Sequence, residues 1–236
     1  MYEPFSVRSF RFQWPADLMA SWAFEMETII LGWYVLTITD SVLVLTIFAS
    51  MQWLGTLIAP YLGVLGDRWG RRTMLCLLRA SYLTTSIITM SLALTDTLNA
   101  SIILGISFVI GLVRPSDLVM RNGLIGDTML GNVLMKAMGV SRTTMDSARI
   151  AGALLGASLF SLLGIGFAYV AVTLFYVISL LLTFGVSSVR TQTGRENGII
   201  NRSPLMDLKE GLRYVWKTPT LLAAMCFAFL VNLTVF

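Results

Sequence analysis

Long apolar runs separated by short polar segments make up most of the chain. The runs cover residues 15–39, 42–65, 73–94, 98–119, 142–163, 167–189 and 220–236. Each approaches or exceeds the length of about 20 residues that a helix needs to cross the roughly 30 Å hydrocarbon layer of a bilayer. The pattern therefore predicts an all-α fold, a polytopic transmembrane helix bundle.

Composition supports this fold class and excludes several functions. Of the 236 residues, 56% are hydrophobic and 13% are charged, which is too apolar for a water-soluble globule of this size. The chain has no histidine, which excludes histidine-based zinc sites and acid–base catalysis. It also lacks a phosphate-binding loop. We therefore expect no enzymatic activity, metal or cofactor, and any proton carrier must be a carboxylate.

The basic residues indicate a topology. The chain carries 17 Lys and Arg and a net charge of +4, which by itself could suggest nucleic-acid binding. None of the 17 falls in the short loops 37–41, 95–99 and 163–166. By the positive-inside rule, the N-terminus is cytoplasmic. The charge is thus a topology signal, and no nucleic-acid partner is expected.

Composition changes after the sixth run and predicts three parts. Residues 1–189 would form a six-helix transmembrane domain, and 190–218 a cytoplasmic linker with an amphipathic helix that starts near Ser203 and Pro204. Residues 219–236 would begin a seventh transmembrane helix. Because the last run has no polar stop, we expect a truncated product of a longer chain. A complete chain with a terminal anchor is the alternative.

A short charged segment between the second and third runs carries the strongest motif. Residues 63–72 read Gly-Val-Leu-Gly-Asp-Arg-Trp-Gly-Arg-Arg. The segment resembles the signature loop between helices 2 and 3 of the major facilitator superfamily of secondary transporters. The matching positions are Gly63, Asp67, Arg68, Gly70, Arg71 and Arg72. The resemblance implies the N-terminal six-helix half of a twelve-helix fold plus the start of helix 7, with lipid around it and the C-terminal half of the chain missing.

Further segments narrow the resemblance. They are residues 9–14, 32–41, 114–115, 124–127 and 146–156. Together they are similar to the bacterial branch that contains macrolide and enterobactin exporters, which implies a location in the bacterial inner membrane. Exporter-type members often carry Gly-Pro-x-x-Gly-Gly in helix 5, whereas residues 152–157 read Gly-Ala-Leu-Leu-Gly-Ala. That departure leaves the direction of transport open.

Two charged stripes lie at helix ends near the signature loop. Arg114, Asp117 and Arg121 share one stripe, and Arg142, Asp146 and Arg149 share the other; each can pair internally. The resemblance implies a conformational latch in which Asp67 and Arg71 tie the end of helix 2 to neighbouring helix ends. We expect Asp117 to join this latch, while Arg114, Asp146 and Arg149 line a cavity. The alternatives are that the arginines only set topology and that the long side chains reach the membrane interface.

Two acids lie about halfway along the first run, where a charge costs about 2.5–3.5 kcal/mol on insertion scales. Glu25 and Glu27 point to nearly opposite faces of a helix. The small and polar neighbours of Glu25 favour it as the acid that faces a cavity and carries protons, while Glu27 meets a neighbouring helix. A neutral, hydrogen-bonded structural role is the alternative. Gly152 and Gly156 form a Gly-x-x-x-Gly pair, which predicts close helix packing.

Two functions remain open. The leading one is a proton-linked secondary transporter that moves an amphipathic small molecule, such as a drug or a siderophore, out of the cell by alternating access. The alternative is a non-transporting membrane scaffold or docking protein that binds partners through residues 190–219. Another five spans beyond residue 236 would favour the transporter.

Overall fold

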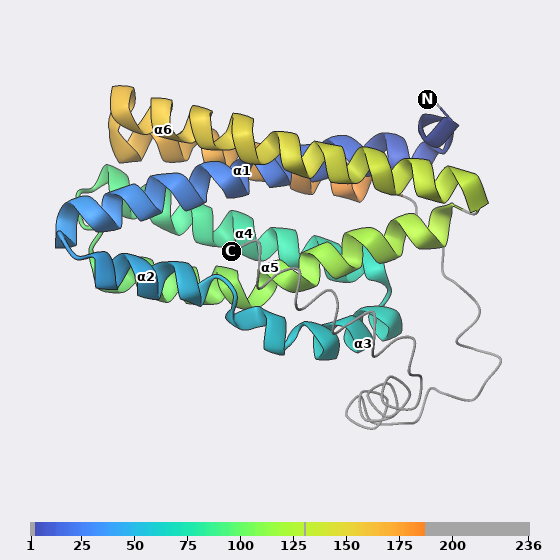
Figure 1. The fold of residues 1–236 in the computed structure, drawn as a ribbon, viewed down its shortest axis with the longest axis horizontal. Helices are drawn as coiled ribbons and strands as arrows, with labels where there is room; N and C mark the ends of the chain where they lie inside the picture. Colours follow the sequence, from blue (N-terminus) through green and yellow to red (C-terminus); the bar gives the residue numbers. More distant parts are fainter. Residues whose placement is uncertain (1–2, 130, 187–236) are drawn as a thin grey trace. The chain divides into compact units, whose positions relative to one another are not determined.

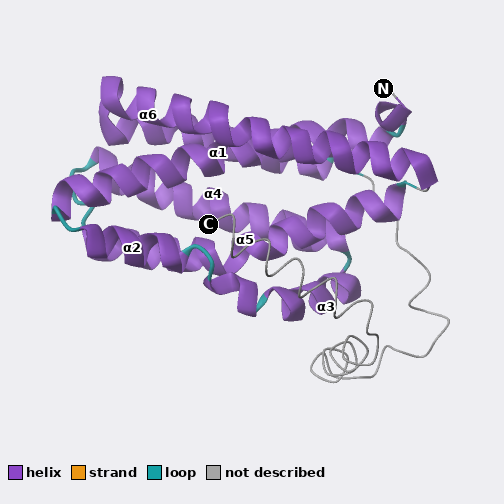
Figure 2. Cartoon of the chain, in the orientation of Figure 1, coloured by secondary structure: helices purple, strands orange, loops and turns teal. Residues whose placement is uncertain are grey.

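The computed structural model describes residues 3–129 and 131–186. The chain separates into one unit at Met1–Thr191 and a second at Gln192–Phe236, and all described residues belong to the first. The predicted linker, its amphipathic helix and the seventh run therefore lie outside the described residues. Within those residues every regular element is a helix, which confirms the predicted all-α class (Figure 1; Figure 2). In chain order the elements are η1 (Glu3–Ser6), α1 (Arg8–Thr39), α2 (Val42–Met51), η2 (Leu54–Leu57), α3 (Ala59–Trp69), α4 (Arg71–Leu94), α5 (Ala100–Thr128) and α6 (Gly131–Phe184).

Helix α1 packs mainly against α6, and glycines on α6 bring the two helices close together. A Cβ atom on Gly152 would lie 2.9 Å from the Cβ of Glu25, and one on Gly156 would lie 2.9 Å from the Cα of Met26. Both distances are shorter than ordinary contacts, so neither position has room for a side chain. The glycine pair therefore packs α6 directly onto the backbone of α1, as the sequence pattern predicts.

The second apolar run is bent near its middle. Helices α2 and α3 are joined by η2 and bent by 50°. At the bend, a Cβ on Gly55 would meet the carbonyl oxygen of Gly111 on α5, and a Cβ on Gly111 would meet the carbonyl oxygen of Met51. Pro60 then lies in the first turn of α3, where its missing N–H needs no partner. The bend thus places two backbones in direct contact.

The signature loop is much shorter than the sequence suggests. Helix α3 continues to Trp69 and α4 begins at Arg71, so only Gly70 between them is non-helical, with φ 94° and ψ 125°. Glycine accepts this positive φ because it has no Cβ. Most of segment 63–72 is therefore helical, and its charged side chains project from two helix ends.

Helix α6 contains two of the predicted spans. A straight helix of its 54 residues would be about 80 Å long, far more than a bilayer is thick. The chain turns at Gly164, whose φ of 76° and ψ of 175° fall in a region open essentially to glycine alone. Figure 1 shows the two arms in yellow and orange, the second running back along the bundle. The predicted runs 142–163 and 167–189 correspond to these arms, and the described helix ends at Phe184.

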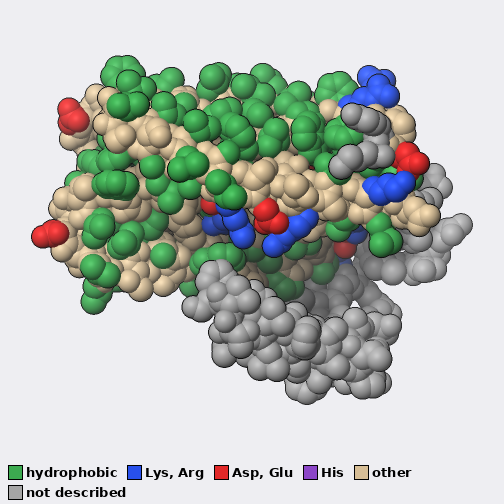
Figure 3. Space-filling model, turned by 45° about the horizontal axis from the view of Figure 1, so that its top comes forward, with side chains coloured by type: hydrophobic (Ala, Val, Ile, Leu, Met, Phe, Trp, Pro, Cys, Tyr) green, Lys and Arg blue, Asp and Glu red, His purple; other side chains and the backbone are tan. Residues whose placement is uncertain are grey.

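The described surface is strongly apolar. Helices α4, α5 and α6 are long and apolar enough to cross a membrane, and the bent pair α2–α3 is a fourth candidate. Helix α1 falls outside this group among the described helices, because its acids lower its hydropathy. Large side chains such as Leu57 (84%) and Leu162 (80%) are exposed, and Figure 3 shows hydrophobic side chains across much of one face. Such a surface suits contact with lipid or with another apolar surface.

Candidate functional site

Arg71, the first residue of α4, joins three helix ends. Its guanidinium donates from Nε to Oδ1 of Asp67 on α3 (3.0 Å) and from Nη1 to two acceptors on α5, the Gly123 carbonyl oxygen (2.7 Å) and Oδ1 of Asp127 (2.9 Å). Gly123 makes room for this group, because a Cβ there would lie 2.8 Å from Nη1. Next to it, Arg72 donates to the carbonyl oxygen of Phe184 on α6 (2.6 Å). The arginines of the signature motif thus connect α3, α5 and α6 to the start of α4.

Asp117 does not belong to this group, contrary to the expectation from its place on the α5 stripe. It lies in the core, 4% exposed, and contacts Arg79 and Arg121. Asp127, three turns further along the helix, is the acid of α5 that reaches Arg71. The stripe thus predicted correctly that α5 supplies an acid to the group around Arg71, but it predicted the wrong position along that helix.

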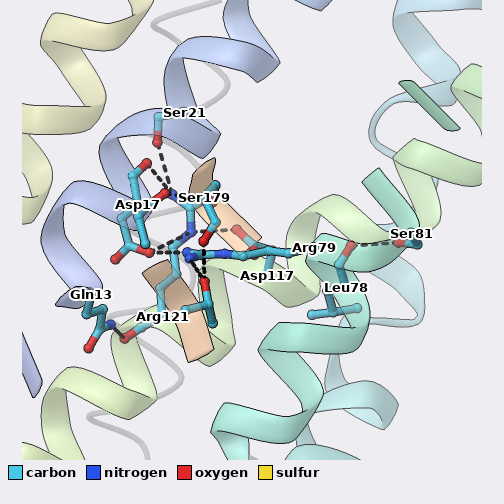
Figure 4. Close-up of polar contacts among 11 residues, drawn as sticks. Gln13, Asp17, Ser21, Leu78, Arg79, Ser81, Asp117, Arg121 and Ser179 are labelled. Carbon is cyan, nitrogen blue, oxygen red and sulfur yellow. Dashed lines mark hydrogen bonds and ion pairs between the residues drawn. The ribbon is translucent and has the colours of Figure 1, made fainter. Parts of the chain in front are cut away.

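A network of two acids and two arginines lies inside the bundle (Figure 4). Asp17 comes from α1, Arg79 from α4, and both Asp117 and Arg121 from α5. Their exposed fractions are only 5%, 1%, 4% and 7%, in that order. We call these four residues the buried ion network. Its charges balance, which is the condition under which buried ions are tolerated.

Within the buried ion network each arginine faces both acids. Arg79 binds Asp17 directly, and its Nε lies 3.9 Å from Oδ1 of Asp117. Arg121 places its Nε 2.5 Å from Oδ2 of Asp117 and 3.6 Å from Oδ1 of Asp17. Arg79 also donates to Thr183 on α6. The network therefore links α1, α4, α5 and α6 at one level of the bundle.

Sequence reasoning did not single out this network. Arg79 counts there among the basic residues that set the topology, Arg121 belongs to the α5 stripe with an interfacial role as the alternative, and Asp17 is not considered. One signal was present: Asp17 and Arg79 are charges within or beside apolar runs, and a charge there needs a partner. The sequence shows that a partner is needed but not which helix supplies it.

The two acids of α1 point to different surroundings. Glu27 is 3% exposed and accepts hydrogen bonds from Tyr169 (3.1 Å) and Tyr176 (2.7 Å), both on the second arm of α6. The cavity beside it, lined also by Gln52 and Ser107, has a volume of about 10 Å³. That volume suits at most a single water molecule. A substrate therefore has no access to Glu27 in this arrangement.

Glu25 lies on a more open side, together with Arg114 of α5. Its Oε1 is 3.6 Å from Nη2 of Arg114, and the two side chains are 21% and 24% exposed. The guanidinium carbon lies 3.3 Å from the ring centre of Phe24 and 5.5 Å from that of Trp53. Nη1 donates to Oε1 of Gln52 at 3.2 Å. We call these five residues the Arg114 site; it combines an acid, a cation and aromatic rings, and its two charged side chains are partly exposed.

The second predicted stripe stays on the surface. Asp146 lies 3.3 Å from Arg142 and 4.0 Å from Arg149, and all three side chains are more than half exposed. This stripe pairs internally, as predicted. The α5 stripe does not pair as one unit, because Arg114 turns toward Glu25 while the other two members enter the buried ion network. Within residues 3–129 and 131–186 no cluster of three or more acidic or cysteine side chains could hold a metal ion.

Comparison with known proteins extends the resemblance to the whole chain. Residues 1–235 match the family model described as transmembrane secretion effector, a family of the major facilitator superfamily. No curated protein matches the sequence.

Two solved structures show the same fold. The human organic anion transporter MFSD10 (TETRAN) is 19% identical with a TM-score of 0.59, over 76% of this chain and 47% of that protein. PepTSo, a transporter of the POT family, is 14% identical with a TM-score of 0.60, over 80% of this chain and 38% of that protein. The chain thus spans less than half of either structure. It belongs to the major facilitator superfamily, in the family described as transmembrane secretion effectors.

Proposed function

We propose that this chain, together with a second six-helix half, is a proton-linked secondary transporter in the bacterial inner membrane. It exports an amphipathic small molecule, such as a drug or a siderophore, by alternating access. Family membership and the fold of the solved relatives support a transporter. The alternative, a membrane scaffold that acts through residues 190–219, concerns residues outside those that the structure describes.

The single observation that carries the proton-linked mechanism is the pairing of Glu25 with Arg114. Both side chains are partly exposed at mid-bundle, and neither belongs to the charge-balanced buried ion network. Protonation of Glu25 would release Arg114 from its only described carboxylate partner. An acid whose protonation changes a contact between α1 and α5 can couple proton binding to a conformational exchange.

The connections made by Arg71 support the alternating-access part of the proposal. They join the ends of α3, α4 and α5 through one guanidinium. In our proposal these contacts form the latch that stabilises the outward-facing state, on the cytoplasmic side of an N-in topology. Opening at that side would require the latch to break, so the latch biases the equilibrium between the two global states.

Glu25→Gln tests the coupling, with Glu27→Gln as the matched control. In everted vesicles with an imposed pH gradient, the transporter should accumulate labelled erythromycin or enterobactin. Glu25→Gln should abolish this uphill accumulation and spare downhill exchange, because glutamine keeps the shape but cannot ionise. Glu27→Gln should be milder, because its carboxylate is held by two tyrosines away from the accessible side. Full uphill accumulation by Glu25→Gln would exclude that residue as the coupling group.

A further inference from the structure

Arg114 differs from the other arginines inside the bundle. Arg79 and Arg121 have side chains only 1% and 8% exposed, and each contacts two carboxylates. The Arg114 side chain is 24% exposed and has one described carboxylate partner, Glu25, at 3.6 Å. That separation is beyond hydrogen-bond range. The positive charge of Arg114 is thus less fully compensated than that of the network arginines, and it reaches the surface.

The guanidinium also retains hydrogen-bonding capacity. It carries five N–H donors in a planar fork, and the described residues accept one hydrogen bond from it, at Gln52. A planar fork of this kind suits a carboxylate, phosphate or sulfonate, which can accept two bonds at once.

The aromatic residues of the Arg114 site favour an anion over a cation. The face of Phe24 is already covered by the guanidinium, whose carbon lies 3.3 Å from the ring centre. A cationic ligand would have to displace Arg114 from the ring that would attract it. Trp53 is 58% exposed, so its indole can stack against the apolar or aromatic body of a ligand. A bound anion would meet the guanidinium edge and the indole together.

We propose that Arg114 is the anion-binding residue of the transport site, so that the substrate carries an anionic group attached to an apolar or aromatic body. This inference rests on the proposed transport function and names the substrate class for it. Because protonation of Glu25 would favour anion binding, it couples the proton and the anion in the same direction, in place of the exchange that proton-driven export requires. Glu25 is then a competitor for the guanidinium, because its carboxylate and the substrate's anionic group need the same cation. Removing the charge of Glu25 must strengthen anion binding, whereas it would weaken the binding of a cation.

Matched ligands test the proposal in the purified protein in nanodiscs, by equilibrium dialysis at pH 7.5. The probes are 2-naphthoate and (2-naphthyl)methylammonium, which share one ring system and differ in the sign of the charge. We expect naphthoate to bind more tightly. Arg114→Gln should weaken its binding about tenfold or more, as expected for losing a charged hydrogen bond. Glu25→Gln should strengthen it about tenfold.

Two further variants serve as controls. Lys136→Gln removes a positive charge from a side chain that is 48% exposed near the N-terminus, and it should leave naphthoate binding unchanged. Arg114→Lys keeps the charge and packing but loses the planar fork, so it should bind with intermediate affinity. If Arg114→Gln fails to fold, Arg114→Lys and Glu25→Gln still decide the question. Tighter binding of the ammonium probe, or weaker naphthoate binding by Glu25→Gln, would overturn the proposal.

The anion site and the transport function can fail separately. Arg114-dependent naphthoate binding without any pH-driven flux would defeat the proposed function and leave the anion site standing. Flux of a cationic substrate that survives Arg114→Gln would overturn the anion site and leave the proposed transport function standing. Naphthoate binding that is equal in the wild type and in Arg114→Gln would show simple partitioning into the apolar surface, and it would overturn the anion site.

Discussion

Replacing Arg79 with methionine would break the buried ion network at its most buried member. Methionine keeps an unbranched side chain of similar reach, so the change removes the cation and little packing. Asp17 and Asp117 would then share Arg121 as their only described cation, and the buried charge would change from zero to −1. The hydrogen bond from Arg79 to Thr183 would also be lost. The free energy of unfolding should fall because a negative charge remains uncompensated in the core.

The expected magnitude follows from burial and distance. Two unit charges 3.9 Å apart, the separation of Arg79 Nε from Asp117 Oδ1, interact by about 4 kcal/mol at an effective dielectric of 20. Removing one partner of a buried pair costs about 3–5 kcal/mol in general. We therefore expect Arg79→Met to lower the free energy of unfolding by about 3–5 kcal/mol. Adding Asp17→Asn should restore about 1–3 kcal/mol of this, because the remaining pair is again balanced.

The assay is unfolding of the purified protein in mixed micelles by increasing SDS, followed by the loss of helical circular dichroism. Arg142→Met is the matched control: it removes an arginine from a pair whose side chains are 66% and 51% exposed, and it should cost less than about 1 kcal/mol. A cost below about 1 kcal/mol for Arg79→Met would refute the reasoning. Additive losses of unfolding free energy in the Arg79→Met, Asp17→Asn double variant would refute it too, because they would show that the two charges do not act together.

Four other substitutions probe the latch, the N-terminal contact and the helix packing. Arg71→Ala and Asp127→Asn should each slow vesicle flux, since both lose the hydrogen bond between Arg71 and Asp127. The double variant should be little slower than Arg71→Ala, which already loses this bond and those to Asp67 and Gly123; additive slowing would contradict a shared role. A hydrogen bond and the charge of Lys136 hold the pKa of Glu3 below its ordinary value of 4.5. The small stability that this contact adds is present above pH 4.5 and is lost as the pH falls through the lowered pKa of Glu3. Lys136→Gln should return the titration of the Glu3 carboxyl, followed by carbon NMR, to its ordinary range. An unchanged titration in this variant would count against the contact. Gly152→Ala should separate α1 from α6 and lower the SDS concentration at mid-unfolding, because its Cβ would lie 2.9 Å from another Cβ; an unchanged midpoint would show that the helices adjust freely.

The fold could be predicted from the sequence to a large extent, because a bilayer forces each spanning segment into a long apolar helix. Local rules also predicted local contacts. Asp67 and Arg71 are four residues apart, which places them on one helical face, and they pair at 2.9 Å even though Gly70 interrupts the helix between them. Gly152 and Gly156 pack closely for the same reason. Periodicity is informative wherever both partners lie on one short stretch of chain.

The rest could not be predicted because it depends on which helices are neighbours and at what depth. Asp17 and Arg79 are 62 residues apart, and no periodicity relates them. The spacing of the α5 stripe could not reveal that Asp117 turns into the core while Asp127 reaches the latch. The two tyrosines that hold Glu27 lie on the second arm of α6 and gave no signal of their own in the sequence.

The buried ion network has a consequence for biosynthesis. During synthesis Asp17 enters the membrane before its partner Arg79, which follows 62 residues later. At about 5–20 residues per second, the delay is roughly 3–12 s. Throughout that interval α1 holds acids whose insertion costs about 2.5–3.5 kcal/mol each, and α1 is not among the described helices apolar enough to span a membrane by themselves. We therefore expect α1 to become stable in the bilayer only after α4 and α5 have been synthesised. These helices should then enter the membrane as a group rather than one at a time.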